Sequence, residues 1–140
     1  MSTTEPARDR WGAAPSLDDI AAMARAALDT LEEPFRTPAR AVAIKVEDFA
    51  DDETLEAMKI ENPYDLTGLY SGVALTLEQV SAPSQIPPMV WLYRLPILDE
   101  WAATEGLALE NLVAHVVIHE LGHHFGWSDE EIDAVNEADD

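Results

Sequence analysis

The stretch LALENLVAHVVIHELGHHFG, residues 107–126, constrains the fold of this chain more than any other part of the sequence. Its segment from Leu112 to Leu121 is apolar on almost every side of a helix. A helix of this kind has to be covered by other elements over most of its surface. Gly126 is a typical residue for ending it. We therefore expect a central, buried helix around which the other elements pack.

The rest of the sequence predicts a small mixed sheet packed on helices, so the fold class is α+β (mixed α/β). Ser16 and Asp19 resemble a capping box that opens a helix over residues 17–33, and Pro34 ends that helix. Hydrophobic alternation and turn residues predict the other elements. These are a strand over 41–49, a short helix over 51–62, a bent strand over 66–76, a strand over 89–95, a short helix from Pro96 and an acidic terminal helix from Ser128.

A length of 140 residues with 47% hydrophobic residues suits one domain with a single core. Residues 1–15 are polar, contain Pro6 and Pro15 and show no periodicity, so we expect a flexible N-terminal segment. The compact domain is then expected to span residues 16–140. Because there is no cysteine, disulfides and thiolate metal ligands are excluded together.

Charge and hydropathy limit the partners. The chain has 8 basic and 28 acidic side chains, and a net charge of −20 repels phosphate backbones, so we expect no nucleic-acid partner. An acidic surface can attract divalent cations or basic peptides, but its commonest role is solubility. The N-terminus lacks the apolar core of a secretory signal, and no apolar run approaches the length of a membrane span. We expect a cytoplasmic protein without a membrane partner, and the oligomeric state stays open.

Three of the four histidines fall within residues 119–124. His119 and His123 are four residues apart, so on a helix they project from one face and can bind the same zinc ion. Glu120 lies one step round the helix, beside the metal, where it can hold the attacking water. Together they form the H-E-x-x-H pattern of zinc metalloproteases.

A catalytic zinc needs a third protein ligand and one open position. The pattern continues as H-E-x-x-H-x-x-G-x-x-D, in which Gly126 lets the chain turn back towards the metal. Asp129 is then the best-placed oxygen ligand. Glu130 and Asp133 compete with it, as does Glu131 to a lesser degree.

The segments HELGHHFGWSDEEID, GLYSGVALT and WLYRLPIL resemble the small bacterial zincin-like metallopeptidases, often called minimal zincins, over roughly residues 17–136. The resemblance implies a compact zincin-like domain with one Zn²⁺ on His119, His123 and Asp129, and Glu120 as the catalytic residue. Metzincins share the extended motif but place a methionine turn after the zinc helix, whereas all four methionines here precede it.

The expected function is therefore a zinc-dependent peptidase. It would hydrolyse peptide bonds in peptides or unfolded proteins through a metal-activated water, with Glu120 as the general base. The alternative is a non-catalytic, zinc-binding acidic interaction module, a degenerate zincin.

For several other residues the sequence supports less specific predictions. We expect His115 to be a hydrogen-bonded core histidine, and His124 to be partly exposed with a weaker prospect of stabilising an oxyanion. Tyr70, Tyr93 and Arg94 are candidate donors to the tetrahedral intermediate, although structural roles are the more ordinary interpretation. The strand MVWLYRL could pair with an extended substrate, provided that one of its edges is free.

Overall fold

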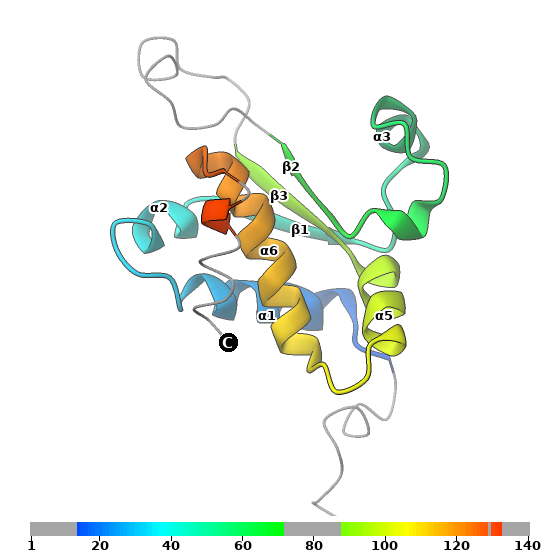
Figure 1. Cartoon of the computed structure of the whole chain (residues 1–140), viewed down its shortest axis with the longest axis horizontal. Coiled ribbons are helices and arrows are strands. Elements are labelled where there is room, and N and C mark those ends of the chain that lie inside the picture. Colours follow the sequence, from blue (N-terminus) through cyan, green and yellow to red (C-terminus); the bar gives the residue numbers. More distant parts are fainter. Residues whose placement is uncertain (1–13, 72–87, 129, 133–140) are drawn as a thin grey trace, which may run out of the picture.

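The computed structural model describes residues 14–71, 88–128 and 130–132. In chain order the elements are α1 (Leu17–Leu28), α2 (Arg36–Arg40), β1 (Ala43–Glu47), α3 (Asp52–Ala57), the 3₁₀ helix η2 (Pro63–Asp65), β2 (Gly68–Ser71), β3 (Met89–Tyr93), α5 (Arg94–Ala103) and α6 (Leu109–Phe125) (Figure 1). Residues 130–132 are helical as well. No helix in these ranges has both the length and the apolar character needed to cross a membrane.

The three strands form a mixed sheet in the order β1-β3-β2. β3 pairs with β1 in parallel and with β2 in antiparallel orientation. This confirms the predicted α+β class with a small mixed sheet. The proposal that MVWLYRL binds a substrate strand is wrong, because both edges of β3 are already occupied by neighbouring strands.

One face of the sheet is covered by α1 and α6, which also pack against each other (Figure 1). Val90 and Leu92 of β3 point to this side and are fully buried. They belong to the same core as Val117 and Leu121 of α6. α6 is therefore the central helix that its apolar sequence predicts, since it packs against the sheet, α1 and α5.

A smaller cluster occupies the other face of the sheet. Because side chains alternate along a strand, Trp91 and Tyr93 of β3 point away from α6. They pack with Leu55 of α3 and with Leu66, next to η2. The segment that contains α3 and η2 therefore covers part of this face, and α3 lies to one side of the sheet (Figure 1).

α1 is shorter than predicted. It begins with the expected capping box, in which Asp19 N–H donates to Ser16 Oγ at 3.1 Å and Ser16 N–H donates to the Asp19 carboxylate at 2.8 Å. It ends at Leu28 and not at residue 33. The Thr30 hydroxyl donates to the Ala27 carbonyl at 2.6 Å, so a side chain satisfies a carbonyl of the last turn.

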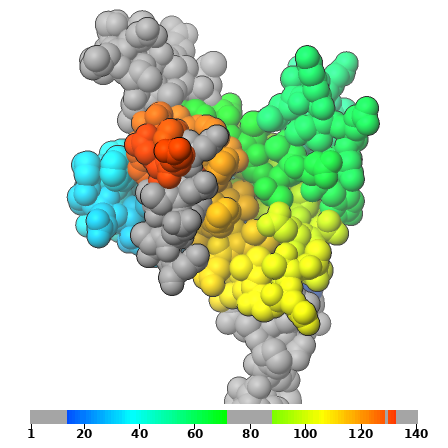
Figure 2. All heavy atoms as spheres, in the orientation of Figure 1, coloured from blue at the N-terminus to red at the C-terminus, as the bar shows by residue number. Residues whose placement is uncertain are grey.

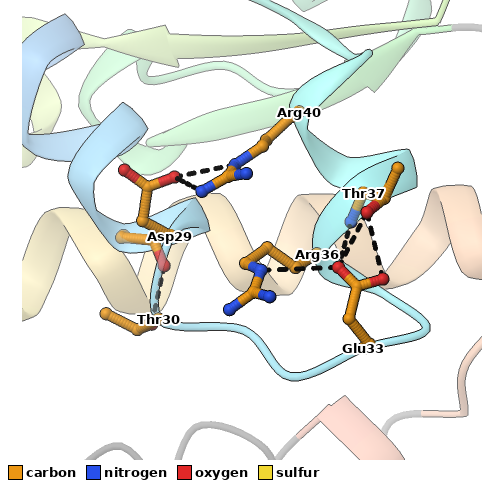
Figure 3. Close-up of polar contacts among 7 residues, drawn as sticks. Asp29, Thr30, Glu33, Arg36, Thr37 and Arg40 are labelled. Atoms are coloured by element: carbon orange, nitrogen blue, oxygen red, sulfur yellow. Dashed lines mark hydrogen bonds and ion pairs between the residues drawn. The ribbon is translucent and has the colours of Figure 1, made fainter.

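The sequence interpretation missed α2, which follows this turn. Figure 3 shows that the Glu33 carboxylate accepts from the Thr37 N–H at 3.0 Å and from the Thr37 hydroxyl at 2.7 Å. Pro38 lies in the first helical turn, where a backbone N–H has no helical partner, so it does not prevent the helix. Arg40 Nη2 lies 2.8 Å from Asp29 Oδ1, and this ion pair links α2 to the end of α1.

Other boundaries differ by a few residues. α3 ends at Ala57, earlier than Asn62, and β3 gives way to α5 at Arg94. The predicted flexible segment lies almost wholly outside the described residues, and Pro15 at its end is buried. The part of the predicted bent strand beyond Ser71 also lies outside them.

Candidate metal centre

His119 and His123 lie next to each other on α6. Their ring centroids are 5.3 Å apart and the rings are nearly perpendicular, at 85°. With 3.6 residues per turn, the two side chains leave the helix about 40° apart. His119 is half-buried and His123 is exposed. Two imidazoles therefore share an accessible stripe of the helix, which is the arrangement that one zinc ion requires of them.

Glu120 leaves α6 about 100° from His119, on the side that faces β2. Its carboxylate accepts a hydrogen bond from the Tyr70 backbone N–H. Burial raises the pKa of Glu120, while His119, His123 and the Tyr70 N–H act in the opposite direction. A carboxylate whose proton affinity is raised in this way is suited to taking up and releasing a proton.

Gly68 allows β2 to come this close to α6. A Cβ at this position would lie 2.8 Å from Val116 Cγ1 and 3.1 Å from Glu120 Cγ. Any side chain would therefore push β2 away from Glu120. The sequence interpretation took the glycines of this strand as a bend or bulge and missed both this close approach and the Tyr70 N–H. A glycine inside a strand can also mark close packing, and that was the available signal.

On the other side of the histidine stripe, the chain turns back at the end of α6. Gly126 adopts the expected left-handed conformation, with φ of 73°. Trp127 N–H donates to the Gly122 carbonyl at 2.9 Å, and Gly126 N–H donates to the His123 carbonyl at 3.2 Å. This pair of bonds is a Schellman motif, which reverses the direction of the chain.

The described residues after this turn, 127–128 and 130–132, pack against the side of α6. A Cβ on Gly122 would lie 2.5 Å from Ile132 Cγ1, so the absence of a side chain makes room for Ile132. Phe35 contacts Trp127 edge to face, with ring centroids 4.9 Å apart, and holds the segment from the outside. Gly122 lies about 60° from His119 on the side away from Glu120. The two histidines are therefore flanked by β2 on one side and by residues 127–128 and 130–132 on the other. The latter segment, in orange to red, lies at the surface in Figure 2.

The third ligand is not fixed by this geometry. Asp129 and Asp133 lie outside the described residues. Ser128 N–H donates to the Glu131 carboxylate at 3.0 Å and Glu131 N–H donates to Ser128 Oγ at 3.2 Å, so Glu131 belongs to a capping box. Glu130 is exposed. Among the residues that the structure describes, no three histidine, aspartate or glutamate side chains are grouped to hold a metal, so Asp129 remains a prediction.

Two expectations about the other histidines are wrong. His115 is exposed, because its position on the helix continues the solvent-facing stripe of His119 and His123. His124 is 5% exposed, since β2 covers its side of the helix. Its Nδ1 lies 2.9 Å from the Tyr70 hydroxyl. Burial lowers the pKa of His124 and raises that of Tyr70, which favours the uncharged form of both groups.

Two other candidate donors are also engaged within the fold, Arg94 through hydrogen bonds and Tyr93 through burial. The Arg94 guanidinium donates to the Pro15 carbonyl at 2.6 Å and to Asp48 Oδ1 at 3.1 Å. Tyr93 is 3% exposed. Burial, together with Asp51 and other nearby acidic groups, raises the pKa of Tyr93 to about 12. These contacts favour the structural interpretation of both residues.

Comparison with known families agrees with this geometry. The sequence model of the zincin-like metallopeptidases matches residues 39–138. The chain belongs to this family. The match runs from α2 through the whole zincin-like helix α6 and the segment after it, whereas α1 lies outside it. No curated protein matches the chain.

Proposed function

We propose that this zincin-like chain hydrolyses peptide bonds in peptides or unfolded proteins. In this proposal one zinc ion is held by His119, His123 and Asp129, and Glu120 is the general base. The observation that carries the proposal is the pair of adjacent imidazoles on an accessible face of α6, with a partly buried carboxylate one residue away. Two imidazoles and a carboxylate are a typical ligand set for catalytic zinc and leave one position open.

When bound, zinc supplies a Lewis acid that polarises the scissile carbonyl and makes a water molecule more acidic. The Glu120 carboxylate accepts a proton from the attacking water while the water oxygen bonds to the carbonyl carbon. Glu120 then delivers that proton to the leaving nitrogen as the C–N bond breaks. One water is consumed, and a carboxylic acid and an amine are formed.

The environment of Glu120 favours catalysis over a non-catalytic zinc module. A structural zinc site needs ligands but no general base. Placing a carboxylate in a partly buried position raises its pKa and costs folding free energy, which a purely structural site would have no reason to bear. The acidic interaction module remains the second candidate, supported by the net charge of −20.

The substrate would lie along β2 and not along β3. β2 is an outer strand of the sheet that the structure describes, and its Tyr70 N–H reaches Glu120. An extended peptide placed beside an outer strand can form backbone hydrogen bonds without a deep side-chain pocket.

We propose the cytoplasm as the location of this activity.

The test is a comparison of zinc-loaded wild type with Glu120→Gln on a mixture of unfolded peptides. We expect Glu120→Gln to keep its zinc and to lower kcat by at least about 100-fold, because it removes the general base. Glu105→Gln changes an exposed carboxylate in the same way and serves as the control. Cleavage that persists at the wild-type rate in Glu120→Gln would contradict the mechanism.

A further inference from the structure

Tyr70 contacts α6 at two points that are one helical turn apart. Its backbone N–H donates to the Glu120 carboxylate, and its hydroxyl lies 2.9 Å from His124 Nδ1. Glu120 and His124 are four residues apart, so they leave the helix on the same side. A single residue of β2 therefore spans one turn of the zincin helix, from the catalytic candidate to a buried imidazole.

The His124 contact is costly to break. His124 is 5% exposed, and a buried polar group that loses its hydrogen-bond partner carries a desolvation penalty. The Tyr70 and His124 rings also contact each other, with centroids 5.6 Å apart. Since the Tyr70 side chain is held at this point, its backbone is held over the preceding turn of α6.

Gly68, two residues earlier on β2, also brings this strand into contact with α6. The close approach to Val116 and Glu120 means that β2 is in direct contact with α6 before Tyr70 is reached. On its other edge β2 is paired with β3, with Tyr70 opposite Val90. The position of the Tyr70 N–H relative to Glu120 thus depends on contacts with both α6 and the sheet.

We infer that Tyr70 and His124 form a positioning pair, which locks β2 onto α6 so that the Tyr70 backbone N–H fixes the orientation of the Glu120 carboxylate. This role rests on the proposed function of Glu120 as the general base. A base has to be held within a fraction of an ångström of its productive position, and neighbouring hydrogen bonds commonly provide that constraint. The contact between the Tyr70 and His124 side chains would act through Glu120 and not through the substrate.

The test uses Tyr70→Phe and His124→Leu, each of which removes one side of the hydrogen bond. Tyr64→Phe removes the hydroxyl of an exposed tyrosine and is the control. Hydrogen exchange of the Tyr70 amide is measured by NMR in the metal-free full chain. We expect exchange at this amide to accelerate by about tenfold in both variants, with the α6 amides still protected. His124→Gln keeps a hydrogen-bond acceptor and should restore part of the protection.

Peptide hydrolysis by the zinc-loaded variants provides the second measurement. If wild type is active, we expect Tyr70→Phe to lower kcat and to leave KM unchanged. Unchanged exchange at the Tyr70 amide would overturn the inference, and so would faster exchange with an unaltered kcat. If wild type shows no hydrolysis at all, the proposed function fails. Amide exchange alone then tests whether the Tyr70–His124 contact holds β2 against α6.

Discussion

His123 and His124 are neighbours in the sequence, but their surroundings are opposite. His123 is exposed beside His119, whereas His124 is 5% exposed and bonded to Tyr70. The first belongs to the accessible stripe of α6 and the second to the side that β2 covers. Spacing along a helix can therefore identify a pair of candidate ligands. Whether a neighbouring side chain is exposed or buried depends on which element packs against that side of the helix.

The largest expected effect is a difference in stability between substitutions on the buried side and on the exposed side of α6. Leu121→Ala removes a fully buried side chain and should lower the free energy of unfolding by about 2–5 kcal/mol. His115→Ala changes the exposed stripe and should cost less than about 0.5 kcal/mol. Urea denaturation of the metal-free variants measures both. Similar losses in the two variants would mean that the stripe is not open to solvent.

A smaller effect is expected where β2 meets α6. Gly68→Ala places a Cβ 2.8 Å from Val116 Cγ1 and 3.3 Å from the Trp91 carbonyl oxygen, so β2 has to shift. We expect a loss of about 1–3 kcal/mol, typical of overpacking. Ser71→Ala on the same strand is the control, with little change in thermal unfolding. If Gly68→Ala were as stable as wild type, β2 would not be in close contact with α6 at this position.

The smallest effect concerns alkaline pH. The pKa of Tyr93 is raised to about 12, chiefly by burial, whereas the ordinary value in the unfolded chain is 10.0. The folded state therefore holds this proton more tightly, and the stability that Tyr93 contributes is present below pH 10 and lost as the pH rises towards 12. Tyr93→Phe should flatten the fall in Tm across this range. An unchanged slope would show that Tyr93 ionises as freely in the folded chain as in the unfolded one.

The sequence was sufficient for the features that depend on local spacing. The capping box at Ser16, the glycine cap at Gly126 and the shared face of His119 and His123 follow from helix geometry alone, and the structure contains all of them. The mixed sheet and the central helix could also be predicted, because alternation and an all-apolar helix each imply burial.

Most of the features that were missed depend on contacts between distant segments. His124 is buried because β2 crosses α6, and no helical period contains that information. α2 is the exception, because it involves a local contact: Glu33 accepts from the Thr37 N–H in the first turn of a helix that contains Pro38, a residue that by itself argues against a helix. The Tyr70 N–H is a backbone group, so no residue type marks it as the partner of Glu120.

The zinc content of the purified chain tests the metal centre most directly, measured by elemental analysis for wild type, His123→Ala and His124→Gln. We expect about one zinc per chain in wild type and in His124→Gln, and less than about a tenth of that in His123→Ala, because of these two neighbouring histidines only His123 is a ligand. Equal zinc in wild type and His123→Ala, or loss of zinc in His124→Gln alone, would contradict the assignment of the metal centre.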